Sequence, residues 1–256
     1  MPTLPMDSML TQSPSLLRAC LVAHRGDPAR FPENSLRGFR AALEAGARFV
    51  ETDIQMTADG VAVLSHNLSL QRLTGRDLII PRTPYGRLQD LAANEPGRFG
   101  SQHTELRIGT LEAFVELLLE WPDVHAFIEI KTQSYSVFGP AMIDKVLTLL
   151  APIATRCTLI SSSVEVMETI AVCDGVPGGW VLPGWSDAVR CEAERLNPAI
   201  LFINHKRLPA KAQPLWPGAW RWAVYTINQA QVIHRLVKRG IHLVETNTIS
   251  SLLTNS

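Results

Sequence analysis

Residues 18–53 read RACLVAHRGDPARFPENSLRGFRAALEAGARFVETD. The stretch holds two apolar, strand-like runs, Arg18–Ala23 and Arg48–Asp53, with a run of helical periodicity between them, Ser35–Ala45. Gly46 follows the helical run at the position where a helix commonly ends in a left-handed residue. The pattern predicts a strand, a helix and a second strand, which is the repeating unit of a parallel sheet.

The same alternation continues to the end of the chain. Six more strand-like runs lie at His125–Ile130, Thr158–Ser161, Gly179–Leu182, Ile200–Ile203, Arg221–Thr226 and His242–Thr246. The helix-like runs that accompany them are Leu111–Glu120, Pro140–Leu150, Val164–Cys173, Asp187–Leu196 and Gln229–Arg239, with a short or broken sixth helix around Pro209–Gln213. Eight strands with intervening helices in 256 residues predict an α/β fold, the (β/α)8 or TIM barrel.

Two segments stand outside this alternation. Residues 67–108 hold many glycines and prolines without clean periodicity, and so long a connection usually has a function or covers something. We expect a small insertion here, after the second barrel strand and over one barrel mouth. Residues 1–17, which carry prolines and serines, are expected to form a flexible N-terminal segment, and residues 18–256 a single barrel domain.

Composition excludes several classes of partner. Lys and Arg number 24 and Asp and Glu number 24, so the chain has no overall attraction to nucleic acid or to an anionic membrane. No apolar run approaches the roughly 20 residues of a membrane helix. The N-terminus lacks the pattern of a secretory signal, and the four cysteines show no paired spacing. We expect a cytoplasmic protein without membrane insertion.

Charged residues concentrate where the predicted strands end. Glu51 and Asp53 lie two apart at the end of the second strand, and Glu129 and Lys131 lie two apart at the end of the third. Residues two apart in a strand point the same way, and functional groups in such barrels lie at the C-terminal ends of the strands. Three inward carboxylates repel one another unless a cation neutralises them. Oxygen ligands of this kind suit one divalent cation, Mg²⁺ or Ca²⁺.

Two histidines flank these carboxylates. His24 ends the first strand, and His66 follows the tight-turn signal Asp59-Gly60. With a two-residue loop, His66 would face Asp53 across a hairpin, although a bulge would shift this register. Two imidazoles beside a metal can act as the acid and the base of a phosphodiesterase, because the pKa of histidine lies near neutral pH. Arg25 and Lys131 would neutralise the phosphoryl oxygens.

These residues resemble the glycerophosphodiester phosphodiesterase family. The resemblance runs from about Leu21 to the C-terminus. Its motifs are His24-Arg25-Gly26, Pro32-Glu33-Asn34-Ser35, Glu51-Thr52-Asp53, Thr57-Ala58-Asp59-Gly60, His66 to Thr74, Glu129-Ile130-Lys131, Trp222 to Asn228 and Glu245-Thr246-Asn247.

The resemblance implies a fold, a reaction and a set of site residues. The family fold is a (β/α)8 barrel with a small insertion. The reaction is hydrolysis of a small-molecule glycerophosphodiester to sn-glycerol 3-phosphate and an alcohol, and it leaves the head group and the oligomeric state open. The implied acid and base are His24 and His66, and the implied metal ligands are Glu51, Asp53 and Glu129. Arg25 and Lys131 would contact the phosphate, and Glu33 and Asn34 would support the site. Trp222 would pack on the glycerol, although a core position is an equal alternative for it.

Two positions depart from the family pattern, and two alternatives stay open. Asn67 and Asn247 stand where the family usually carries aspartate, so each removes negative charge near the predicted site. We expect an active enzyme, because the inferred ligands and histidines are unchanged. One alternative is a related phospholipase D-like lyase that releases a cyclic phosphate, and the other is a catalytically silent barrel that binds a phosphodiester.

Overall fold

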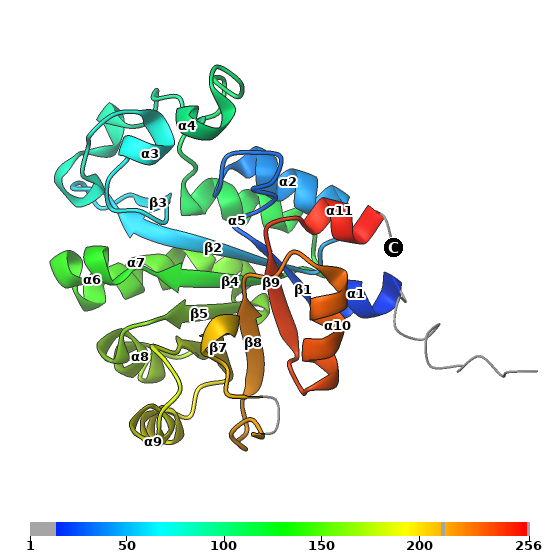
Figure 1. The fold of residues 1–256 in the computed structure, drawn as a ribbon. Helices are drawn as coiled ribbons and strands as arrows, with labels where there is room; N and C mark the ends of the chain where they lie inside the picture. The colour runs from blue at the N-terminus through cyan, green and yellow to red at the C-terminus, as the bar shows by residue number, and fades with distance from the viewer. Residues whose placement is uncertain (1–13, 211–212, 255–256) are drawn as a thin grey trace, which may run out of the picture.

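The computed structural model describes residues 14–210 and 213–254 and shows a closed barrel of eight parallel strands (Figure 1). Each barrel strand pairs in parallel with the next, and β1 pairs with both β2 and β9, which closes the ring. The (β/α)8 prediction is confirmed. The barrel strands are β1 (Leu21–His24), β2 (Phe49–Met56), β4 (His125–Ile130), β5 (Cys157–Ser161), β6 (Gly178–Val181), β7 (Ile200–Asn204), β8 (Arg221–Tyr225) and β9 (Leu243–Thr246).

Helices surround the barrel, and most begin and end close to the predicted bounds. They are α1 (Pro14–Cys20), α2 (Leu36–Glu44), α5 (Leu111–Leu119), α6 (Thr132–Phe138), α7 (Pro140–Leu150), α8 (Val164–Ala171), α9 (Asp187–Leu196), α10 (Ala230–Lys238) and α11 (Ile249–Thr254), with 3₁₀ turns η5 (Ala151–Arg156) and η6 (His205–Arg207). After β7 the structure has the short turn η6, which ends before the short or broken helix predicted around Pro209–Gln213. Pro209, Ala210 and Gln213 are not helical, and residues 211–212 of that range lie outside the described residues.

The start of the chain differs from the prediction. Arg18–Cys20, expected to open the first strand, instead completes helix α1, because Leu17 and Cys20 lie one turn apart and both are buried in the core. Of the segment expected to be flexible, residues 14–17 belong to this helix, and residues 1–13 lie outside the described residues.

Side chains along each barrel strand alternate between two cores. On β7, Ile200 and Phe202 belong to the inner cluster that fills the barrel, whereas Leu201 and Ile203 belong to the outer cluster beneath the helices. The inner cluster consists of Val22, Phe127, Ile160, Ile200, Phe202, Ala223 and Leu243. Because alternate residues share a face, this cluster fixes which later residues reach the barrel mouth.

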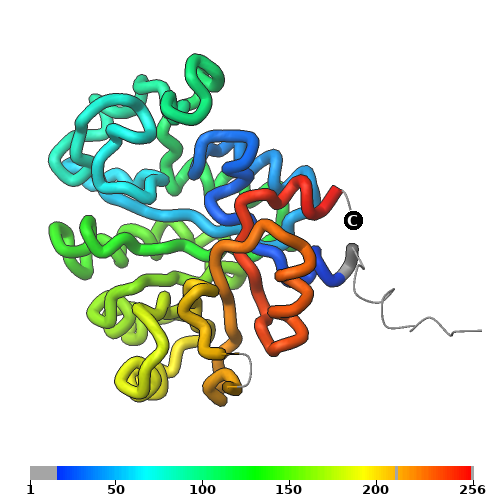
Figure 2. Tube along the Cα trace, viewed as in Figure 1, coloured from blue at the N-terminus to red at the C-terminus, as the bar shows by residue number. Residues whose placement is uncertain are grey.

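The insertion after β2 is a small lobe with its own apolar cluster. Figure 2 shows it at the upper left, above the hairpin of β2 and β3 (Ala62–Leu64). Its elements are β3, α3 (Gln71–Thr74), η3 (Ile80–Arg82), η4 (Tyr85–Arg87) and α4 (Pro96–Phe99). Leu70, Ile80 and Leu88 are fully buried within it.

The predicted hairpin forms, but its register differs by one residue. Thr57 N donates to Val61 O (3.0 Å), so the loop holds three residues, 58–60, with Gly60 in the left-handed region at φ +78°. Asp53 therefore lies opposite Ser65, whose N–H donates to Asp53 O (3.0 Å), and the predicted pairing of Asp53 with His66 is wrong. The extra loop residue acts as the bulge that shifts the register.

Across residues 14–210 and 213–254, no single helix is both long and apolar enough to cross a membrane. Two neighbouring helical segments, Thr132–Phe138 and Pro140–Arg156, pass that test only when taken together, and they are bent by 111° at their junction.

Candidate active site

The inner face of the barrel leads directly to a polar pocket. On β1 the buried Val22 is followed two residues later by His24, on β4 Phe127 leads to Glu129, and on β9 Leu243 leads to Glu245. We call the resulting cavity of about 240 Å³ the inner pocket. It is lined by His24, Arg25, Glu51, His66, Glu129, Lys131, Ile160, Ser162, Val181, Phe202, Tyr225 and Glu245.

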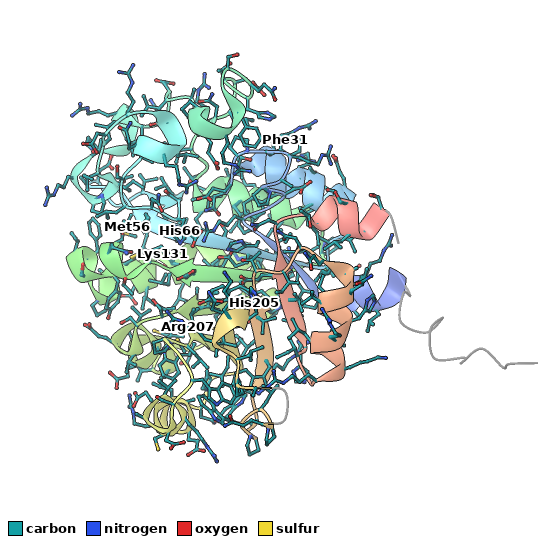
Figure 3. All side chains as sticks on the ribbon, in the orientation of Figure 1. Phe31, Met56, His66, Lys131, His205 and Arg207 are labelled. Carbon is teal, nitrogen blue, oxygen red and sulfur yellow. The ribbon has the colours of Figure 1, made fainter. Side chains whose placement is uncertain are left out.

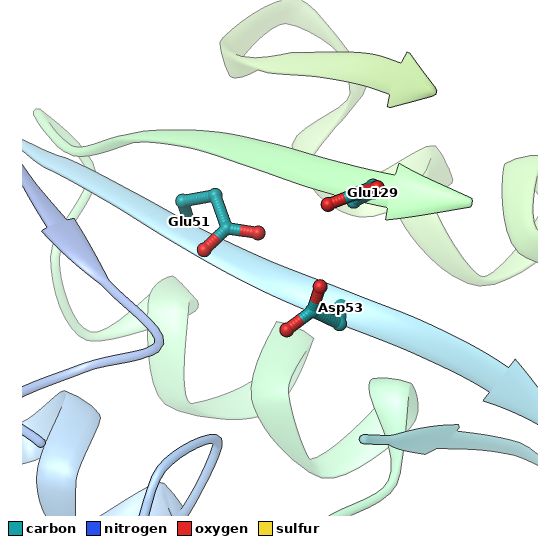
Figure 4. A group of neighbouring side chains, drawn as sticks. All are labelled: Glu51, Asp53 and Glu129. Atoms are coloured by element: carbon teal, nitrogen blue, oxygen red, sulfur yellow. The ribbon is translucent and has the colours of Figure 1, made fainter. Parts of the chain in front are cut away.

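Three carboxylates face one another at the edge of this pocket. Oxygens of Glu51, Asp53 and Glu129 all lie within 4.8 Å of one another, and Figure 4 shows the three side chains converging from β2 and β4. Glu51 and Asp53 are almost fully buried. Because hard oxygen donors at this spacing suit a divalent cation, the group is capable of binding a metal ion.

Burial and mutual repulsion raise the pKa of most of these carboxylates. Burial, followed by the charges of Asp53 and Glu245, raises the pKa of Glu51 well above its ordinary value. Burial also raises the pKa of Glu129 to about 7, against the opposing effect of Lys131, and that of Glu245 to about 8. The pocket therefore holds carboxylates that retain protons near neutral pH until positive charge enters.

Asp53 is the exception, because two cations contact it. Arg25 Nε lies 2.9 Å from Asp53 Oδ2 and Lys131 Nζ lies 3.3 Å from Asp53 Oδ1, while Asn34 Nδ2 donates to Oδ2 (2.9 Å). Burial alone would raise the pKa of Asp53, but Arg25 and Lys131 outweigh it, and the pKa is lowered. Asp53 is thus anionic.

The first loop, residues 25–35 between β1 and α2, positions these partners. Arg25 and Asn34 both adopt left-handed conformations, and Asn34 N donates to Arg25 O (3.0 Å). Gly26 between them has φ +90°, and a Cβ on it would lie 2.8 Å from the backbone of Gly38, so only glycine fits. Glu33 Oε2 accepts from Arg25 (3.1 Å). The structure therefore brings the predicted Glu33 and Asn34 to the site, behind Arg25 and Asp53.

Each of the two histidines contacts an asparagine. His24 Nδ1 lies 2.7 Å from Asn247 Oδ1, and His66 Nδ1 lies 2.8 Å from Asn67 Oδ1. Since an amide oxygen only accepts, each imidazole carries its proton on Nδ1 and leaves Nε2 free to accept. His24 Nε2 lies 3.9 Å from a carboxylate oxygen of Glu51.

The same environment keeps both imidazoles neutral. Burial, aided by Arg25, lowers the pKa of His24 to about 4. Burial also lowers the pKa of His66. The side chains of His66 and Lys131 lie together at this mouth of the barrel (Figure 3), and both line the inner pocket. The register change in the hairpin has not removed His66 from the site.

Comparison with known proteins agrees with this geometry. The sequence model of the glycerophosphoryl diester phosphodiesterase family matches residues 24–150, which hold both histidines and the three carboxylates. The chain belongs to this family. It is a family of hydrolases.

Relatives extend the likeness beyond the matched residues. A glycerophosphodiester phosphodiesterase of Caldanaerobacter subterraneus is 25% identical over 93% of this chain and 97% of its own length. A probable glycerophosphodiester phosphodiesterase 1 of Mycobacterium tuberculosis is 36% identical over 51% of this chain and 48% of its own. Among solved structures, an Oleispira antarctica phosphodiesterase in complex with the product sn-glycerol-3-phosphate has a TM-score of 0.79 at 21% identity, covering 93% of this chain and 97% of that one.

Trp222 is a predicted site residue that lies away from both the inner pocket and the acidic group. Trp222 is the neighbour of the inward Ala223, so it points outward and packs against Trp185 and Trp216 (ring centroids 5.5 and 5.9 Å). The prediction that Trp222 packs on glycerol is therefore wrong, and its alternative as a core residue holds. Tyr225, three residues later, lines the pocket instead.

Sequence reasoning also missed Glu245 as a site residue. It lies 3.9 Å from His24 Nε2 and lines the inner pocket from β9. The alternation of β9 around Leu243 contained the signal, because Glu245 is the next residue on that inward face. On β8 the same two-residue alternation leads from the inward-facing Ala223 to Tyr225, which also lines the inner pocket.

The insertion contacts the site through a buried carboxylate. Glu95 is 1% exposed, and its Oε1 accepts from Glu33 N (2.7 Å) while its Oε2 accepts from Arg98 (2.7 Å). Arg72, also on the insertion, pairs with Glu33. A chain of ion pairs thus runs from the insertion through Glu33 to Arg25.

Arg25→Met should destabilise the protein strongly. The substitution removes a cation from the fully buried Asp53 and also from Glu33, and breaking a buried pair typically costs about 3–5 kcal/mol. We expect a loss of that order in the free energy of unfolding, measured by urea denaturation with a chelator present. Arg40→Met is the matched control, since Arg40 pairs with Glu120 through two bonds on the surface, where a loss under about 1 kcal/mol is expected. Similar losses in the two variants would contradict the balance described for Asp53.

Proposed function

We propose that this protein hydrolyses glycerophosphodiesters to sn-glycerol 3-phosphate and an alcohol, using one divalent cation, Mg²⁺ or Ca²⁺, and the two histidines. The observation that carries the proposal is the close group of Glu51, Asp53 and Glu129 with His24 and His66 beside it. Family membership supports the reaction class. The product sn-glycerol-3-phosphate bound to the similar Oleispira antarctica structure supports the kind of ligand.

The three carboxylates would hold the cation, which supplies positive charge to the phosphoryl oxygens when bound. Arg25 and Lys131 lie beside them and would bind the phosphate. Both pair with Asp53, so each is already oriented before substrate arrives. Glu33 and Asn34 would hold Arg25 and Asp53 in place from the first loop. Donors fixed in advance toward developing charge stabilise a transition state without reorganising.

The histidines would move protons at Nε2. In each ring Nδ1–H is donated to an asparagine oxygen, so Nε2 is the atom that exchanges a proton with substrate. One imidazole takes the proton of the attacking hydroxyl, and the other, once protonated, gives a proton to the oxygen of the leaving alcohol. Attack by water gives the products directly, whereas attack by a glycerol hydroxyl gives a cyclic phosphate that water then opens.

We propose further that residues 18–256 work as one catalytic domain with the insertion as part of its site, because Glu95 and Arg72 contact Glu33. Cytoplasmic action fits the four unpaired cysteines, two of them buried. A protein with this activity would take part in lipid and glycerol metabolism.

Purified protein should release sn-glycerol 3-phosphate from glycerophosphodiesters in the presence of Mg²⁺ or Ca²⁺. Removing the cation with EDTA should abolish the reaction, because the acidic group would then lack its compensating charge. A panel of diesters with different alcohols, assayed by product analysis, tests this. No turnover with any diester and any divalent ion would favour the silent barrel. A stable cyclic phosphate without glycerol 3-phosphate would favour the lyase.

His24→Ala and His66→Ala should each reduce kcat by about 10² to 10⁴-fold, the usual contribution of general acid–base catalysis. Calorimetry should show that both variants still bind the cation, whereas Glu51→Ala should bind it more weakly. His103→Ala is the control, since His103 lies on the insertion and packs on Phe31 and Phe99 outside the inner pocket. Near-normal kcat in either His24→Ala or His66→Ala would refute the proposed roles.

The cation should stabilise the protein more at pH 8 than at pH 6. Burial raises the folded-state pKa of Glu129 to about 7 and that of Glu245 to about 8. At pH values between the unfolded-state pKa of these groups and their folded-state pKa, the metal-free folded state therefore binds more protons than the unfolded state. The stability that these protonated groups contribute is lost as pH rises through 7 to 8. A bound cation favours the charged forms and offsets that loss. We expect a larger Mg²⁺- or Ca²⁺-induced rise in Tm at pH 8, and an equal rise at both pH values would argue against cation binding here.

A further inference from the structure

A second cavity adjoins the inner pocket. It measures about 260 Å³, and His24 and Arg25 line both cavities. We call it the outer pocket. It is lined by His24, Arg25, Pro28, Ala29, Glu33, Arg98, Asn228, Asn247 and Thr248.

Four separate segments build the outer pocket, and hydrogen bonds join them. Ala29 N in the first loop donates to Asn247 O after β9 (3.0 Å), and Asn247 N donates to Asn228 Oδ1 after β8 (2.9 Å). Arg98 of the insertion donates to Pro28 O. These bonds connect the walls, so the cavity is formed before any ligand binds.

The position of the two pockets suits the two arms of a phosphodiester. A phosphate at Arg25 and His24 lies where both pockets meet, so one substituent can enter each. The inner pocket offers the apolar surfaces of Val181, Phe202 and Tyr225 together with charged groups. The outer pocket is then left for the other substituent, which departs as the alcohol.

The charges of the outer pocket disfavour a cationic alcohol. Glu33 is the one carboxylate that lines it, and Glu33 is already paired with Arg25 and Arg72. Arg98 adds a further guanidinium. The lining residues include no phenylalanine, tyrosine or tryptophan, so a quaternary ammonium would find neither a free carboxylate nor an aromatic face.

Its polar groups instead suit hydroxyls. Asn228 Oδ1 accepts from the backbone N–H of Asn247 and from the hydroxyl of Thr246. The side-chain Nδ2 atoms of Asn228 and Asn247 make no hydrogen bond within residues 14–210 and 213–254. These N–H groups can donate to hydroxyl oxygens, and Thr248 adds a hydroxyl. We propose that the outer pocket is the subsite for the leaving alcohol and that it selects an uncharged polyol, such as glycerol, over a quaternary ammonium alcohol. This inference rests on the proposed function.

The test compares kcat/KM for glycerophosphoglycerol and glycerophosphocholine with Mg²⁺ or Ca²⁺ present. The wild type should prefer glycerophosphoglycerol. Asn228→Asp keeps an oxygen for Asn247 N and Thr246 but replaces the N–H donors by a charged oxygen. We expect this variant to lower the glycerol-to-choline ratio by about three- to fivefold, mainly by raising kcat/KM for glycerophosphocholine, the size of effect typical of a partly exposed ion pair.

Asn204→Asp is the matched control. Asn204 ends β7 at the same barrel mouth, its Oδ1 accepts from Lys206 N (3.0 Å), and it lines neither pocket. The glycerol-to-choline ratio should be unchanged in this variant. Equal or better use of glycerophosphocholine by the wild type, or equal changes of the ratio in both variants, would overturn the subsite while leaving the hydrolase intact. Failure of both diesters to react would overturn the proposed function, and the inference with it.

Discussion

The repulsion between buried carboxylates at one barrel mouth is the constraint on which the rest of the site depends. Glu51, Asp53 and Glu245 are buried, and the partly exposed Glu129 lies beside them. They come from β2, β4 and β9, where each continues an inward-facing row of side chains. Two fixed cations, Arg25 and Lys131, keep Asp53 charged, but they do not suffice for the other three, whose pKa values are all raised. A divalent cation would supply the positive charge that is missing. The spacing of the carboxylate oxygens and their raised pKa values therefore both favour binding of such a cation.

Much of the surrounding structure can be understood as support for Arg25. The first loop needs a left-handed Arg25 and a glycine after it to turn the guanidinium back over Asp53. Glu33 accepts a hydrogen bond from that guanidinium, and Glu95 of the insertion accepts one from the backbone N–H of Glu33. The insertion therefore contributes to the electrostatics of the barrel mouth. Its buried carboxylate is satisfied by arginines of the insertion itself, so it adds rigidity without adding to the repulsion in the inner pocket.

Local periodicity predicted the barrel well, because each strand and helix carries its own hydrophobic pattern. Strand β4 and helices α7 and α9 have the predicted bounds. The acidic group followed from the same two-residue alternation. The predictions that failed, or were not made, concern how one segment packs or pairs with another. The hairpin register depended on one extra loop residue, Trp222 faced the helices because its neighbour Ala223 faced inward, and the contact of Glu95 with Glu33 joins residues 62 positions apart. No local pattern contains such a pairing.

The two asparagines at the positions where the resemblance predicts aspartate fit the same balance of charge. Asn67 and Asn247 each accept a hydrogen bond from a histidine, which fixes the imidazole proton on Nδ1 as an aspartate would. An aspartate at either position would bring a fifth carboxylate to a mouth where the pKa values of Glu51, Glu129 and Glu245 are already raised. It would then compete with Glu51 and Glu129 for the same positive charge. A neutral amide orients the ring without entering that competition, so it preserves the geometry of the histidines and would leave a bound cation to the acidic group.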